Sequence, residues 1–182
     1  MAQRPVPVEY GAEYGASMAH MTVIAAYVVA RLEEAGATLA CLPISARPAS
    51  YGSGWPDIVR DAIEAYGYTP DRVRPRVPSA AAISSMDTAF AWLALIPSDR
   101  YVLRRMVAAR SMVHPLTGRH LASWRKLGRL VGADHRACQR WHGNGIAIIA
   151  TKLYASGAVD LDVARAWLDE RGLAMQVEAF AA

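Results

Sequence analysis

The chain is poor in cysteine and lacks any long apolar run. Its 182 residues include two cysteines, Cys41 and Cys138, too few for a disulfide framework, which favours a reducing compartment. The longest apolar run, Met21 to Ala30, is much shorter than the roughly 20 residues that a membrane span requires. No charged-then-apolar signal sequence opens the chain. We therefore expect a cytoplasmic protein with no membrane partner, and the basic segment described below adds an expected association with the nucleoid.

Alternation of apolar and polar residues, the pattern of half-buried strands, is nearly absent. The hydrophobic fraction of 53% is dominated by alanine, the best helix former. We therefore predict an all-α fold, a helical bundle preceded by an N-terminal helical segment. The predicted organisation is an N-terminal region over 1–67, a linker over 68–78 and a helical domain over 79–182.

In the N-terminal region, we expect an irregular arm over 1–16 and a first helix from Ser17 to Ala35. Gly36 follows as a helix stop, because glycine readily adopts the left-handed conformation that ends helices. Prolines and glycines punctuate residues 43–56, and Pro56 opens a short helix that ends near Tyr66.

The linker carries Arg72, Arg74 and Arg76, which lie on one side if the segment is extended. These arginines are either solvated loop charges or a phosphate-contacting arm.

Beyond the linker the pattern is helical. Ser79, or the pair at 84–85, can cap a helix whose apolar residues recur at a spacing of three or four: Ile83, Met86, Phe90, Leu93 and Ile96. Ser98 can cap the next helix, with Tyr101, Val102, Met106, Ala109 and Val113 facing inward and Arg100, Arg104, Arg105 and Arg110 facing outward. A final helix is expected from Asp160 to about Arg171.

Positive charge is concentrated in one segment. Residues 100–142 contain ten Lys and Arg and one acid, Asp134, whereas the flanking segments are mildly acidic. Such concentration is typical of a polyanion partner or an acidic protein surface. Arg104 and Arg105, like Arg72, Arg74 and Arg76, are included as possible contacts with phosphates or with an acidic protein surface.

Within this segment, residues 124–141 have the spacing of a helix-turn-helix. Leu127 and Val131 share one helix face, with Gly128 as a small neighbour. Gly132 suits a turn that needs positive φ, and Asp134 can cap the second helix. Cys138 and Trp141 then face the core.

The arrangement leaves donor-rich side chains for base edges and phosphates. The candidate nucleic-acid contacts are Arg119, Ser123, Arg125, Lys126, His135, Arg136, Gln139 and Arg140. The alternative is an ordinary helical hairpin with a solvated basic face. Asp134 adds negative charge near phosphates, and Gly143-Asn144-Gly145 predicts an early end to the second helix.

Other chemistry has little support. His135, Cys138 and His142 share a helix face, but no fourth ligand is evident, so no metal site is predicted. No phosphate loop or nucleophile motif is present. We therefore expect no cofactor, no catalytic residue and no enzymatic activity.

Several motifs resemble a small family of alphaproteobacterial phage and gene-transfer-agent activators. They are Arg76-Val-Pro-Ser79, Met86-Asp87 followed by Ala91-Trp92-Leu93, Ser123-Trp124-Arg125-Lys126-Leu127, and Gln139-Arg140-Trp141 leading into Ala147-Ile148-Ile149-Ala150. The resemblance covers about the last 60% of the chain. It implies a sigma region 4-like helix-turn-helix in an anti-terminator that engages RNA polymerase, DNA, a companion promoter-binding activator and Nus-type elongation factors.

Two other classes stay open. A small-terminase-like subunit that recognises DNA for packaging would form a closed ring. A pure protein-interaction module would bind its partner without the steep salt dependence of phosphate contacts.

Overall fold

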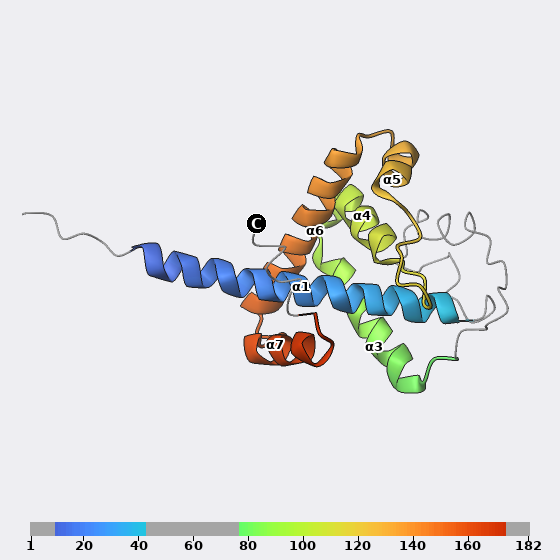
Figure 1. The fold of residues 1–182 in the computed structure, drawn as a ribbon. Helices are drawn as coiled ribbons and strands as arrows, with labels where there is room; N and C mark the ends of the chain where they lie inside the picture. Colours follow the sequence, from blue (N-terminus) through green and yellow to red (C-terminus); the bar gives the residue numbers. More distant parts are fainter. Residues whose placement is uncertain (1–9, 43–76, 174–182) are drawn as a thin grey trace, which may run out of the picture.

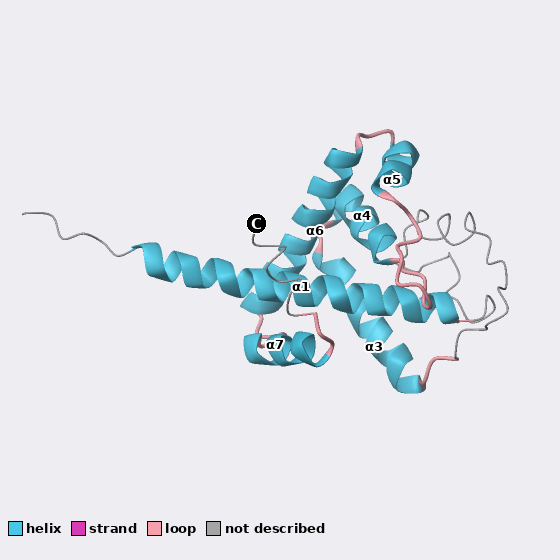
Figure 2. Ribbon diagram, in the orientation of Figure 1, coloured by secondary structure: helices cyan, strands magenta, loops and turns pink. Residues whose placement is uncertain are grey.

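The protein is all-α, as predicted. The computed structural model describes residues 10–42 and 77–173, and the side chains of the first helix from Met18 onward. The helices are α1 (Tyr10–Cys41), α3 (Ala80–Ala91), α4 (Tyr101–Ser111), α5 (Trp124–Val131), α6 (His135–Ala155) and α7 (Leu161–Glu170), with the short 3-10 helices η2 (Trp92–Leu95) and η3 (Ser98–Arg100) between α3 and α4. In these two ranges Figure 2 shows helices and loops and no strand, and the one β-type pairing is an isolated antiparallel bridge between Val113 and His120.

Helix α1 runs across the molecule and packs on α3, α4, α6 and α7 (Figure 1). Its residues Ile24, Val28, Leu32 and Leu39 are all but completely buried, and their spacing places them on one helix face. They belong to the same core cluster as residues of every other α-helix. The predicted boundary at 68–78 stays a prediction, because residues 43–76 lie outside the described part of the chain, as do Arg72, Arg74, Arg76 and the helix expected at 56–66.

The predicted bounds of the first helix are wrong. The helix begins at Tyr10, within the expected irregular arm, and continues through Gly36 to Cys41. Gly36 is a point of close contact between helices, since a Cβ atom there would overlap the backbone carbonyl of Ser111 at the end of α4. The absence of a side chain lets α1 and α4 touch.

The predictions for α3 are confirmed, and those for the start of α4 are partly wrong. The Ser79 hydroxyl accepts a hydrogen bond from the Ala82 amide at 3.1 Å and caps α3. Ser98 does not cap α4, because η3 comes first and Arg100 occupies the cap position without a side-chain bond. Tyr101, expected inside, is 58% exposed.

Helix α6 does not end early at residues 143–145, contrary to the prediction. It is continuous over 21 residues. A Cβ atom at Gly145 would lie 2.5 Å from Cγ2 of Val107 in α4, whereas nothing lies within 4 Å of one at Gly143. Contact with α4 therefore offsets the low helix propensity of glycine here.

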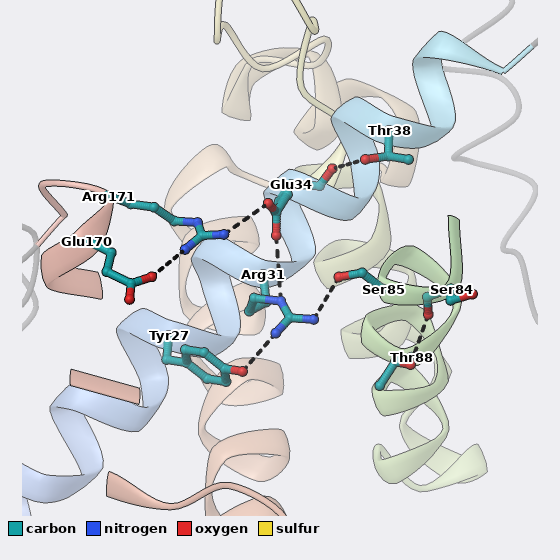
Figure 3. A network of polar contacts seen from close by, with 9 residues as sticks. All are labelled: Tyr27, Arg31, Glu34, Thr38, Ser84, Ser85, Thr88, Glu170 and Arg171. Carbon is teal, nitrogen blue, oxygen red and sulfur yellow. Dashed lines mark hydrogen bonds and ion pairs between the residues drawn. The ribbon is translucent and has the colours of Figure 1, made fainter. Parts of the chain in front are cut away.

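The C-terminal helix α7 begins as predicted. The Asp160 carboxylate accepts hydrogen bonds from the Asp162 and Val163 amides at 2.8 and 3.1 Å. A polar network then ties α7 to α1 and α3 (Figure 3): Arg31 donates to the Tyr27 hydroxyl and to Ser85, both at 2.9 Å, and pairs with Glu34. Arg171 meets the same Glu34 at 3.7 Å from the α7 side.

Among the described residues no single helix is long and apolar enough to cross a membrane, although α3–η2 and η3–α4 together pass that test as a pair bent by 101°.

Candidate nucleic-acid interface

Helices α5 and α6 form a tightly connected pair; the predicted turn at Gly132 and cap at Asp134 are confirmed, and the Ser123 cap of α5 was not predicted. The Ser123 hydroxyl accepts from the Lys126 amide at 3.3 Å and starts α5. Gly132 ends it with φ of 68°, the left-handed conformation that favours glycine. The Asp134 carboxylate accepts from the Arg136 amide at 3.1 Å and starts α6.

Small and apolar residues line the side on which α5 and α6 pack together and against the core. Leu127 and Cys138 are fully buried. A Cβ atom at Gly128 would lie 2.5 Å from the carbonyl oxygen of Ala133, so glycine allows α5 to approach the turn. Val131 and Trp141 are half-buried and pack against the core, in the inward orientation predicted for them.

The first residue of α5, Trp124, anchors the pair to the rest of the molecule. The Arg110 guanidinium from α4 lies over the Trp124 ring at 4.3 Å, and His142 of α6 meets the same ring edge-on at 5.4 Å. Arg110 also donates to the Ala122 carbonyl at 3.0 Å. Burial, with the positive charges of Arg110 and His120, lowers the pKa of His142 to about 4, so its imidazole is neutral at neutral pH.

A second contact joins this anchor to α1. The Nδ1 atom of His120 lies 2.9 Å from the Arg110 carbonyl, which can only accept, so Nδ1 is the donor. The Nε2 atom lies 3.5 Å from the Glu33 carboxylate. Burial raises the pKa of Glu33 against the opposing charge of Arg110, and burial together with Arg110 lowers the pKa of His120.

Five arginines, named here the arginine-rich surface, lie on α5 (Arg125 and Arg129), on α6 (Arg136 and Arg140) and in the loop before α5 (Arg119). All five are exposed, and within the described parts of the chain none of them forms an ion pair. By contrast, the arginines of α1, α7 and the α7 C-cap, at positions 31, 165 and 171, each pair with an acid.

Most of the predicted contact residues lie on or beside this surface. Ser123 and Gln139 are exposed, while Lys126 and His135 are half-buried. The prediction omitted Arg129, which is exposed in the last turn of α5. The sequence could have indicated this contact, because Arg129 lies three residues before Gly132 and therefore beside the turn on the helix surface.

The outward orientation predicted for three arginines of α4 is wrong. Arg104, Arg105 and Arg110 are half-buried. Arg104 donates to the Ile96 carbonyl at 2.5 Å. Arg110 contacts the Trp124 ring and the Ala122 carbonyl. The Nε atoms of Arg104 and Arg105 are buried. Arg104 and Arg110 turn toward the buried carbonyls of Ile96 and Ala122, because such acceptors need a donor.

An open hollow lies where α5 meets α6. Arg125 and Arg129 line it from α5, Asp134 and His135 line it from the start of α6, and the turn glycine forms part of its floor. Among the residues that the structure describes, no group of three or more His, Cys, Asp or Glu could hold a metal ion. The lining of the hollow provides charged side chains, and the guanidinium groups of Arg125 and Arg129 provide hydrogen-bond donors.

An all-α protein with a capped helix pair and an unpaired arginine surface is the class that the described residues define. The chain belongs to the family whose model is described as a domain of unknown function (DUF6362), which matches residues 41–149. The matched segment includes α3, α4, α5 and most of α6. Comparisons with curated proteins and with solved structures found no match.

Proposed function

We propose that this protein is a transcription regulator that binds nucleic acid through α5 and α6 while engaging RNA polymerase. The observation that carries the proposal is the arginine-rich surface: five exposed arginines on α5, on α6 and in the loop before α5, none of which forms an ion pair with a described residue. Unpaired cations on one face are the electrostatic footprint of a polyanion partner. The sigma region 4-like identity of the helix pair is part of this proposal.

In the proposed complex, α6 acts as the recognition helix. Arg136, Gln139 and Arg140 are exposed in its first two turns, where a helix-turn-helix protein contacts base edges in the major groove. Arginine is suited to guanine and glutamine to adenine. In this proposal Arg119 and Arg125, which lie on either side of Ser123 in the chain, contact phosphates.

The motif resemblance extends the proposal to the partners. On that basis the protein acts on a phage-like gene cluster as an anti-terminator or co-activator, together with a promoter-binding activator and Nus-type elongation factors. The arginine surface could contact DNA and an acidic polymerase surface in turn, because guanidinium groups bind phosphates and carboxylates alike.

A terminator read-through reporter tests the proposal. The double variant Arg136→Ala/Arg140→Ala should abolish read-through while its helical circular dichroism and thermal midpoint stay unchanged. Arg165→Ala is the matched control, since Arg165 is exposed on α7, outside the helix pair, and among the described residues pairs only with Asp162, at 3.9 Å. Unchanged read-through in the double variant would refute the proposal.

Genome-wide occupancy and light scattering separate the alternatives. A regulator that travels with polymerase gives occupancy spread along the transcribed cluster, whereas a sharp promoter peak means a site-bound activator. A closed ring in solution would favour the small-terminase-like packaging subunit, and a monomer or dimer counts against it. Partner binding that is insensitive to salt would favour a pure protein-interaction module.

A further inference from the structure

Asp134 is the one acid in a strongly basic segment, and it lies at the edge of the proposed binding surface. Its carboxylate caps α6, and the hydrogen bond from the Arg136 amide is the largest influence that lowers its pKa. The group is therefore ionised at neutral pH. A negative charge at this place repels the phosphates that the neighbouring arginines attract.

His135 is placed to cancel that charge. Its Nδ1 atom lies 2.9 Å from Oδ1 of Asp134, and its side chain is 42% exposed. The other charged groups that line the hollow with it are Arg125 and Arg129 from α5. A protonated His135 would offset the negative charge of Asp134. Arg125 and Arg129 would then supply the remaining charge of the hollow.

We propose that the hollow between α5 and α6 seats a backbone phosphate of nucleic acid and that His135 takes up a proton when the phosphate binds. Arg125 and Arg129 supply the guanidinium donors, and the proton on His135 offsets the charge of Asp134. The inference rests on the proposed function, because it assumes that this surface binds nucleic acid, and it adds a subsite and its proton linkage.

The direction of the pH effect follows from the charges. Histidine is the side chain whose charge ordinarily changes between about pH 5 and about pH 8. Phosphate binding favours the charged imidazole, so by linkage a fall in pH favours phosphate binding. One coupled proton changes the affinity by at most about tenfold per pH unit.

Fluorescence anisotropy with a labelled duplex DNA, at constant ionic strength, measures the linkage. Between about pH 8 and about pH 6 the Kd of the unmodified protein should fall by about threefold to tenfold. His135→Gln should remove most of this pH dependence. His20→Gln, on α1 and outside the lining of the hollow, is the matched control and should keep it.

Two further variants address the subsite itself. Asp134→Asn keeps a good N-cap and should bind more tightly than the unmodified protein at about pH 8, because it removes a negative charge beside the phosphate. Arg129→Ala should weaken binding uniformly across DNA sequences and lower the salt slope by about one. Inorganic phosphate at matched ionic strength separates the sources of the anion: if it displaces the duplex, the hollow binds a free anion and the nucleic-acid subsite is wrong.

The outcomes distinguish the two proposals. Duplex binding with the same pH profile in His135→Gln and in the unmodified protein overturns the proton linkage and leaves the proposed function standing. Absence of duplex binding at either pH, in low salt, overturns the proposed function and the subsite with it.

Discussion

The contact between α1 and α4 at Gly36 predicts an unusually severe effect for a minimal substitution. Gly36→Ala adds one methyl group, and its Cβ atom would overlap the backbone carbonyl of Ser111 and crowd Cα of Met112. Neither atom belongs to a flexible side chain, so the helices themselves must separate. We expect the variant to unfold more easily than the unmodified protein.

The magnitude follows from two opposing effects. Alanine in place of glycine within a helix stabilises by about 1 kcal/mol. Overpacking of a well-packed core costs about 1–3 kcal/mol, and occasionally more. Because backbone atoms receive the methyl group, we expect the upper part of that range and a net loss of about 2 kcal/mol. For a protein of this size such a loss lowers the thermal midpoint by about 4–8 °C.

Gly143→Ala is the matched control, because nothing lies within 4 Å of a Cβ atom there. It makes the same chemical change within a helix, so it should stabilise by about 0.5–1 kcal/mol. Urea unfolding followed by circular dichroism gives the free energy of unfolding of all three proteins. If Gly36→Ala were as stable as Gly143→Ala, the inferred close contact between α1 and α4 would be wrong.

Two further predictions concern ionisation and capping. The pKa of His142 falls from 6.5 to about 4 on folding, so the stability it contributes is complete above about pH 6.5 and is lost as pH falls toward 4; between about pH 7.5 and about pH 5 the loss is about 2 kcal/mol. In His142→Gln the free energy of unfolding should fall less over this interval, and an unchanged slope would contradict the assignment. Asp160→Ala should destabilise by about 1 kcal/mol through loss of the α7 cap, while Asp160→Asn stays near the unmodified protein; equal thermal midpoints for the two variants would show that the cap contributes nothing.

The sequence predicted the features that depend on near neighbours in the chain. A serine or aspartate caps the helix that follows it within three residues, which is why the Asp134 cap and the start of α7 at Asp160 were predicted correctly and Ser79 was among the caps offered for α3. Gly132 was equally accessible, because a tight turn between two helical patterns requires positive φ at one residue. These signals place both helices of the candidate interface.

Glycines inside helices could not be interpreted in the same way. Gly36 and Gly145 look like helix stops in the sequence, yet each is a contact with α4, at Ser111 and Val107. Ser111 is 75 residues away from Gly36 along the chain. Glycine is found both where a helix ends and where two helices touch. The two cases differ in the residue that packs against the glycine, which can be far away along the chain.

The arginines divide in a comparable way, and the division decides how the proposed function should be tested. The sequence pattern predicted a basic segment over 100–142 with the α4 arginines facing outward, but Arg104 and Arg110 turn inward to backbone carbonyls. Arg110 also holds Trp124, the first residue of α5. Substitution of Arg110 would therefore weaken nucleic-acid binding by releasing α5, even if Arg110 never contacts the ligand.

Hydrogen exchange of the α5 amides separates these two causes. An inward variant such as Arg110→Met should lose protection in α5 together with binding, because the cation over the Trp124 ring is removed. An outward variant such as Arg140→Ala should lose binding with α5 protection intact, since Arg140 is exposed and forms no ion pair in the described structure. If the half-buried Arg110 holds α5 in place and the exposed arginines bind nucleic acid, both variants should lose binding. Protection of the α5 amides should then be lost only in Arg110→Met.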